Sequence, residues 1–150
     1  MSTVKYKQKG RVSLFDKEET LSKLSKLGNP LEKIRKVIDF ETFRPELEST
    51  VLTQNKKNNA GCRPYDVVMM LKIILIKRYY NLSVKQTEYQ IYDRLSFKEF
   101  LGLSSGDCVP KANTIWLFNK KLKEKKLEEK FFKQITVYLS NKMQRAPEIT

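Results

Sequence analysis

The sequence predicts an all-α protein, a compact multi-helix domain that contains a trihelical, helix-turn-helix-like unit. Three observations support this fold class. Apolar residues recur every three or four positions along most of the chain, which is the period of a helix with one buried face. Asn-Pro, Ser and Gly positions divide the apolar segments in the way that helix starts and ends require. No segment alternates apolar and polar residues convincingly as a half-buried strand does.

A single helical domain is expected at residues 14–150, after a flexible basic arm at 1–13. The chain has 150 residues, of which 40% are apolar, and this supports one core and is small for two domains. Nothing in the arm repeats at helical spacing. The predicted helices lie at 16–27, 30–38, 45–52, 65–80, 84–95, 97–101, 112–125 and 127–143.

The first three helices are short. Asp16 and Glu19 have the spacing of a capping box, and a glycine ends the helix that they start. Asn29 is a favoured N-cap for the second helix, because the proline after it fits the first helical position. Pro45 starts the third, and the polar stretch 54–61 predicts a solvated loop.

The longest apolar segment, 65–80, predicts the central helix. Its apolar residues lie nearly all the way round a helical projection, so neighbours are expected on several sides. The run 67–76 is interrupted by Lys72 and is too short to span a bilayer. Residues 1–7 are not followed by the apolar stretch of a secretion signal, so no membrane partner is expected.

Four helices follow the central one. Ser83 and Ser96 are expected N-caps of the helices at 84–95 and 97–101. A loop at 104–110 leads to the next helix. The last helix has an apolar stripe made of Phe131, Phe132, Ile135, Leu139 and Met143.

The charge of the chain indicates a polyanionic partner. Thirty Lys and Arg residues against 17 Asp and Glu give a net charge of +13, which is typical of a nucleic-acid-binding domain. Of these cations 23 are Lys, which suits phosphate contacts better than base reading. A surface coated with lysine for solubility is the alternative explanation. The arm adds Lys5, Lys7, Lys9 and Arg11 as candidate DNA contacts.

The sequence predicts no catalytic or metal site. Histidine, the commonest general base and metal ligand, is absent. Cys62 and Cys108 lie 46 residues apart, which is not a zinc spacing. The acidic residues of the central region have no spacing that demands a metal, and Asp66 is explained by its place in the first turn of a helix. Those acidic residues are Asp66, Glu88, Asp93 and Glu99. No cofactor and no small-molecule substrate is expected in this chain.

Residues 83–125 form the candidate DNA-binding unit. The order of helix, short helix, loop and helix is that of a trihelical helix-turn-helix unit, whose last helix enters the major groove. When Ile115, Phe118 and Leu122 face the core, a step of 100° per residue places four others on the opposite side. These are Asn113, Leu117, Lys120 and Glu124.

The helix at 112–125 has residues suited to both base and phosphate contacts. Asn113 can pair with adenine, and Thr114 can touch a thymine methyl group. The lysines that accompany them are expected on phosphates: Lys111, Lys120, Lys121, Lys123, Lys125 and Lys126. The alternative is that Thr114 caps the helix and that the lysines only coat a solvated surface.

The aromatic residues are expected to pack. Trp116 lies between the buried and exposed faces of its helix, which predicts a half-buried side chain. The tyrosine pairs 79–80 and 89 with 92 are expected at the edges of the core. Stacking on nucleotides, by Trp116 or by a platform of tyrosines for single strands, is the alternative.

Six segments of the chain resemble one transposase family. The first two are LSKLGNPLEKI at 24–34 and RPYDVVMMLKI at 63–73. The most specific is YYNLSVKQTEYQIYDRLSF at 79–97, which is followed by FLGL at 100–103, VP at 109–110 and NTIWLF at 113–118. In length and order they resemble the InsH-like N-terminal domain of bacterial insertion-sequence-five group DDE transposases.

The resemblance implies a domain that binds double-stranded DNA at terminal inverted repeats during transposition, in the bacterial cytoplasm with the nucleoid. It places the Asp-Asp-Glu triad and its divalent metal in a catalytic domain that we expect outside this chain. A truncated remnant or regulatory fragment that competes or pairs with full-length transposase, or with itself, is an alternative. Another is the first reading frame of a frameshifted transposase.

Two positions depart from the family pattern. Residues 61–64, Gly-Cys-Arg-Pro, stand where relatives usually have Gly-Arg-Pro-Pro. Lys111 stands where an acidic residue is usual, so an expected helix cap is missing at that point.

Overall fold

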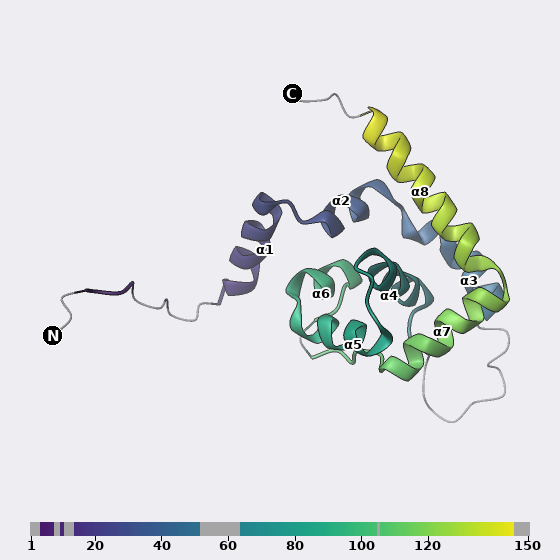
Figure 1. Cartoon of the computed structure of the whole chain (residues 1–150), viewed down its shortest axis with the longest axis horizontal. Helices are drawn as coiled ribbons and strands as arrows, with labels where there is room; N and C mark the ends of the chain where they lie inside the picture. Colours follow the sequence, from purple (N-terminus) through teal and green to yellow (C-terminus); the bar gives the residue numbers. More distant parts are fainter. Residues whose placement is uncertain (1–3, 8–9, 11–13, 52–63, 105, 146–150) are drawn as a thin grey trace.

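The computed structural model describes residues 4–7, 10, 14–51, 64–104 and 106–145, with side chains up to 141. This part of the chain is built of α-helices and one short 3₁₀ helix, without a strand, which confirms the all-α prediction. The elements are α1 (Asp16–Leu27), α2 (Pro30–Val37), η1 (Phe40–Phe43), α3 (Arg44–Val51), α4 (Val67–Tyr79), α5 (Val84–Asp93), α6 (Leu95–Leu101), α7 (Ala112–Glu124) and α8 (Leu127–Arg145). Figure 1 shows their arrangement.

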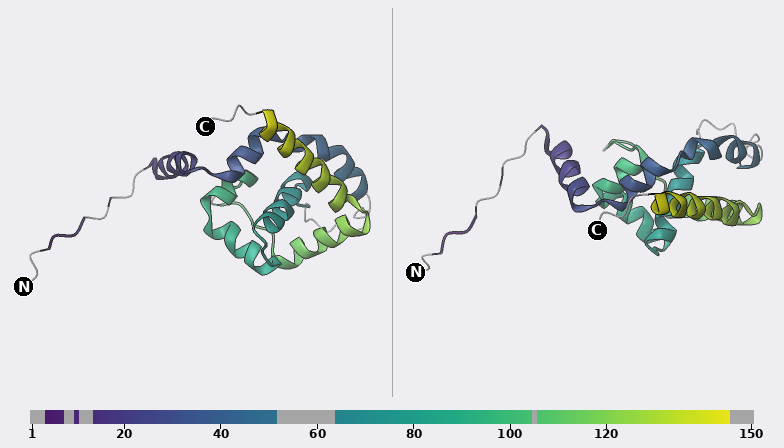
Figure 2. Two further views of the ribbon diagram at one scale, coloured as in Figure 1. Left: turned by 45° about the horizontal axis from the view of Figure 1, so that its top comes forward. Right: turned by 90° about the horizontal axis from the view of Figure 1, so that it is seen from above.

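Helix α4 is the central helix, as its sequence predicts. Eight of its thirteen residues are buried, and it packs against α3, α5, α6 and α7. The views of Figures 1 and 2 show the helices from α2 to α8, without α1, arranged around it. Asp66 is the N-cap of α4 and not a residue of its first turn, because its side chain accepts a hydrogen bond from the Met69 N–H at 3.0 Å.

Two of the predicted caps are confirmed. Asn29 accepts a hydrogen bond from the Leu31 N–H at 3.2 Å, and Ser83 forms a reciprocal capping box with Gln86. The capping box predicted at Asp16 is wrong, because α1 already includes Asp16 and its N-cap, Phe15, makes no side-chain cap.

The short helix α6 begins two residues earlier than predicted. Ser96 lies inside it and does not cap it; Arg94 is both the last cap of α5 and the first cap of α6. The two helices therefore join at a single extended residue.

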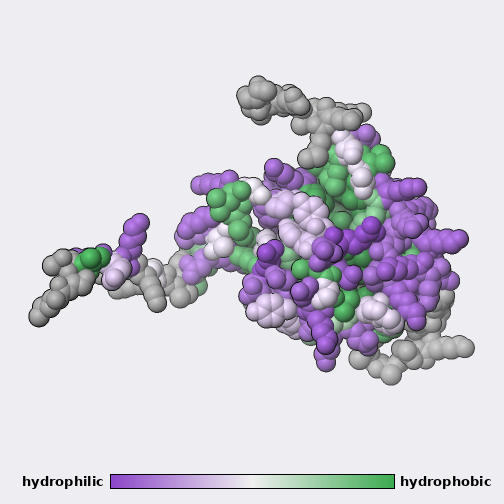
Figure 3. Space-filling model, in the orientation of Figure 1, coloured by the Kyte–Doolittle hydropathy of each residue, from purple (hydrophilic) through white to green (hydrophobic). Residues whose placement is uncertain are grey.

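Helix α1 projects from the body of the domain. It has no buried residue and packs on α6, so the leucine stripe predicted for it stays partly in solvent, with Leu27 84% exposed. Figure 3 shows these apolar side chains on its surface. In the basic arm, Lys5 and Lys7 are exposed. Lys9 and Arg11, the loop predicted at 54–61 and Cys62 lie outside the described residues.

Within the described ranges, no helix has the length and apolar character needed to cross a membrane.

Candidate nucleic-acid interface

Helix α7 is held in place by three other helices. It packs against α4, α5 and α8, and Ile115, Phe118 and Leu122 are buried, as predicted. Asn119 is buried as well, which the prediction missed, and its Oδ1 has no hydrogen-bond partner among the described residues. This packing fixes which face of α7 is free for a ligand.

The N-terminus of α7 is capped by another helix. Lys111 is the N-cap residue but its side chain makes no capping bond. Instead, the Glu88 carboxylate on α5 accepts a hydrogen bond from the Ala112 N–H at 2.7 Å. This carboxylate takes the place of the acidic cap that the sequence lacks at residue 111. Thr114 lies inside the helix, so the alternative in which it caps α7 is wrong.

The outer face of α7 consists of Asn113, Leu117, Lys120 and Glu124, all of which are exposed as the helical projection predicts. Trp116 beside this face is 49% exposed, which confirms the half-buried prediction, and the Lys120 Nζ lies 5.2 Å from its ring centre. A cation close to an aromatic face is attracted to it, so the two side chains support each other's positions.

One flank of α7 borders a groove. Thr114, Leu117 and Lys121 line it together with residues at the end of α3, just before α4 and at the start of α4, including Tyr65 and Met70, and its volume is about 310 Å³. Thr114 and Lys121 are therefore only half exposed. Of the predicted DNA contacts on α7, Asn113 and Lys120 thus face outward, Thr114 and Lys121 face this groove, and Leu117 borders both.

The turn between α7 and α8 extends the positive surface. Lys123, Lys125 and Lys126 are exposed, and Lys126 turns the chain with a left-handed φ of 58°. Lys111 at the other end of α7 is exposed as well. Carboxylates adjoin this turn. Glu128 is buried and pairs with Arg78 at 3.4 Å, while Arg78 also lies 4.3 Å from the Phe132 ring centre.

The acidic residues of the central region have structural partners or lie apart from one another. Asp66 pairs with Arg44 at 2.6 Å, and Glu99 pairs with Arg35 at 3.5 Å. Burial raises the pKa of Asp66, but the hydrogen bonds from Arg44 and the Met69 N–H outweigh it and hold this pKa below its usual value. Among the residues placed by the structure, no three Asp, Glu, Cys or His side chains gather as metal ligands.

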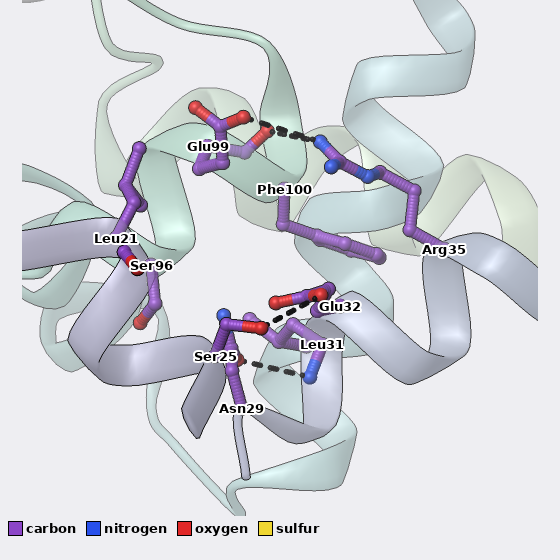
Figure 4. A pocket seen from close by; sticks show the side chains of 10 residues that line it. Leu21, Ser25, Asn29, Leu31, Glu32, Arg35, Ser96, Glu99 and Phe100 are labelled. Atoms are coloured by element: carbon purple, nitrogen blue, oxygen red, sulfur yellow. Dashed lines mark hydrogen bonds and ion pairs between the residues drawn. The ribbon is translucent and has the colours of Figure 1, made fainter. Parts of the chain in front are cut away.

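A pocket of about 270 Å³ lies between α1, α2 and α6 (Figure 4). Its polar side chains bind one another. Ser25 donates a hydrogen bond to Glu32 at 3.1 Å, and Arg35 donates one to the Glu99 carbonyl oxygen at 3.2 Å. The pocket therefore joins the three helices and leaves these four groups satisfied.

The tyrosine prediction is only partly right. Tyr80 packs on Phe97 with ring centres 5.1 Å apart, at the edge of the core. Tyr79, Tyr89 and Tyr92 are more than half exposed instead. Arg94 lies over the Tyr80 and Phe97 rings, at 5.4 and 5.0 Å from their centres.

The unit at 83–125 has the predicted order of elements, with one difference from the short-turn motif. Residues 102–111 separate α6 from α7, whereas a helix-turn-helix has a turn of three to four residues. The main partners of α7 are α5 and α8.

A family described as a transposase domain (DUF772) matches residues 19–121. The chain belongs to this transposase-domain family. The match begins in α1 and ends in α7, so it covers the central helix and most of the outer face of α7. The lysines of the α7–α8 turn lie beyond the matched part of the transposase domain. No solved structure matches the chain significantly.

Proposed function

We propose that this transposase domain binds double-stranded DNA and recognises the terminal inverted repeats of an insertion sequence of the insertion-sequence-five group, in the bacterial cytoplasm on the nucleoid. The observation that carries the proposal is the placement of α7. A helix braced by three others presents Asn113 and Lys120 to solvent, with further exposed lysines at both of its ends. This is the arrangement that a helix needs to enter the major groove.

The distribution of charge favours the same face. Residues 111–126 have six lysines and a single glutamate, whereas residues 30–51, which form α2, η1 and α3, have five acidic and four basic residues. A polyanion is therefore attracted to α7 and its flanking turn more strongly than to residues 30–51, which are close to neutral.

The contacts to DNA divide by residue type. Lysine side chains neutralise phosphates and supply affinity that depends on salt. The Ala112 N–H is already bonded to Glu88, so this amide group at the start of α7 is not free to bind a phosphate. Asn113, on the first turn, is the candidate for reading a base edge.

Charge reversal on α7 tests this proposal. Lys120→Glu with Lys123→Glu should weaken binding to a duplex that has the element end by about tenfold or more, and should make the salt dependence shallower by about two phosphate contacts. The matched control is Lys23→Glu with Lys26→Glu on α1, since both lysines are exposed and have the same spacing. Fluorescence anisotropy at several salt concentrations measures both quantities. Equal losses in the two double variants would remove α7 from the interface.

A further inference from the structure

Three exposed aromatic side chains on α5 and α7 have no role in the core. Tyr89 is 66% exposed, Tyr92 is 56% exposed and Trp116 is 49% exposed. Among the described residues none of these rings pairs with another ring; the Lys120 ammonium beside Trp116 is the one ring contact that they make. Large aromatic surfaces left in water indicate a binding surface. These three residues are called the Tyr–Trp surface below.

The contact between α5 and α7 brings the Tyr–Trp surface together. Glu88 bonds to the Ala112 N–H at 2.7 Å, Tyr92 lies one helical turn after Glu88, and Trp116 lies one turn after Ala112. The path from Tyr92 to Trp116 thus consists of one turn of α5, the Glu88–Ala112 hydrogen bond and one turn of α7. The backbones of Tyr92 and Trp116 are therefore within about 20 Å of each other. Tyr89 is three residues before Tyr92 and shares its side of α5.

Trp116 is turned away from the groove on the other flank of α7. Thr114 and Lys121 line that groove, and the helical projection places Trp116 about 140° or more from both. Trp116 is therefore on the flank nearer α5, where the two tyrosines are.

We propose that the Tyr–Trp surface binds single-stranded DNA by stacking its rings on unpaired bases. In a duplex the faces of the bases are covered by their neighbours, whereas a single strand offers a face at every nucleotide. A separation of at most about 20 Å is within the reach of a single strand of a few nucleotides. The proposal extends the proposed function, since it places an unpaired strand next to the duplex held by α7.

The charge around the rings complements a nucleic acid. Lys85 on α5 and Lys120 on α7 are exposed beside the surface and can contact phosphates. Of the nearby carboxylates, Glu88 is engaged with the α7 N-terminus, whereas Asp93 lies one helical turn after Tyr89 and is an acidic residue at the edge of the surface. An anionic polymer with aromatic bases satisfies both the cations and the rings, which a polyanion without bases does not.

The fluorescence of Trp116 tests the stacking directly, because it is the single tryptophan of the chain. The full chain is titrated at low salt with a 20-nucleotide single strand of mixed sequence, with a blunt 20-base-pair duplex and with inorganic polyphosphate. Saturable quenching is expected with the single strand and not with polyphosphate. Equal quenching by polyphosphate would contradict the proposal, because it would show that charge alone perturbs the indole.

A double variant separates stacking from electrostatic binding. Tyr89→Leu with Tyr92→Leu should weaken single-strand affinity at least tenfold and leave duplex affinity within twofold. Tyr138→Leu is the control, since Tyr138 is an equally exposed tyrosine on α8. Unchanged single-strand affinity, or equal losses for both DNA forms, would overturn the inference. So would a shift from dimer to monomer in light scattering without a loss of single-strand binding, because it would identify a protein interface.

The two proposals fail in different ways. A wild-type chain that binds the duplex but not the single strand contradicts the stacking proposal alone. A chain that binds the single strand but not the duplex contradicts the proposed function and keeps the stacking surface.

Discussion

At the scale of single residues, Arg44 and Asp66 join two parts of the sequence. The Arg44 guanidinium donates two hydrogen bonds to the Asp66 carboxylate, at 2.6 and 3.2 Å, and two more to Glu41, at 2.6 and 3.1 Å. Asp66 also caps α4. The Asp66 carboxylate therefore joins the start of the central helix to the start of α3. This is a structural role for one of the acidic residues of the central region.

This pair makes a prediction about acid stability. The folded-state pKa of Asp66 is below its ordinary value, so the ionised carboxylate stabilises the fold above about pH 5, and this stabilisation is lost as the pH falls through the lowered pKa. Asp66→Asn keeps a cap but loses the ion pair, and should lower the free energy of unfolding at pH 7 by about 0.5–1 kcal/mol.

Urea unfolding from pH 7 to pH 2 measures the effect. The difference between wild type and Asp66→Asn should shrink below pH 5. Asp39→Asn is the control, because Asp39 caps η1 and forms no ion pair within the described residues. A difference that is independent of pH would show that the ion pair is not its source.

At the scale of elements, α7 depends on α5 for its first turn. The N-cap residue Lys111 supplies no acceptor, and Glu88 supplies it from 24 residues earlier in the chain. The orientation of the candidate recognition helix is thereby coupled to the helix beside it. Among the residues that the structure describes, the buried Oδ1 of Asn119 on α7 accepts no hydrogen bond.

Removal of this cap should destabilise the domain. Glu88→Ala leaves the Ala112 N–H without its acceptor and should cost about 1 kcal/mol of unfolding free energy, as the loss of an N-cap does. Adding Lys111→Asp in the same chain should restore much of the loss, because Asp is a favoured N-cap. Chemical denaturation measures the free energy of unfolding of both variants. The capping role would be refuted if Glu88→Ala were as stable as wild type, or if the double variant were no more stable than Glu88→Ala.

The sequence predicts elements better than it predicts their partners. The helical period predicts correctly that α4 is central and which residues form the buried stripe of α7, because periodic burial is a local signal. The predicted start of α6 is two residues late and the predicted cap of α1 is wrong, since propensity allows several starts and packing selects one. The Glu88 cap and the exposure of Tyr89 depend on neighbours distant in sequence, which no local spacing reveals. The DNA contacts themselves stay predictions.

At the scale of the whole molecule, residues 111–126 form a strongly cationic segment, with six lysines and a single glutamate. The lysines of α7 and the following turn are mostly exposed, while cations elsewhere are often paired: Arg35 with Glu99, Lys36 with Glu32, Arg44 with Asp66 and Lys130 with Glu46. Paired cations contribute little to attracting a polyanion. The domain therefore combines an apolar helical core, surface ion pairs on α2, α3 and α8, and a cationic surface at α7 and the following turn.

The salt dependence of duplex binding is the most direct test of whether α7 and the turn after it form a cationic DNA-binding face. Five exposed lysines at α7 and its turn, together with the arm, are expected to neutralise at least three phosphates, so the logarithm of affinity should fall with the logarithm of salt concentration with a slope of about −3 or steeper. A wild-type chain that shows this slope on a duplex supports a cationic DNA-binding face. Affinity that does not change with salt, or no binding to a duplex at low salt, would contradict it.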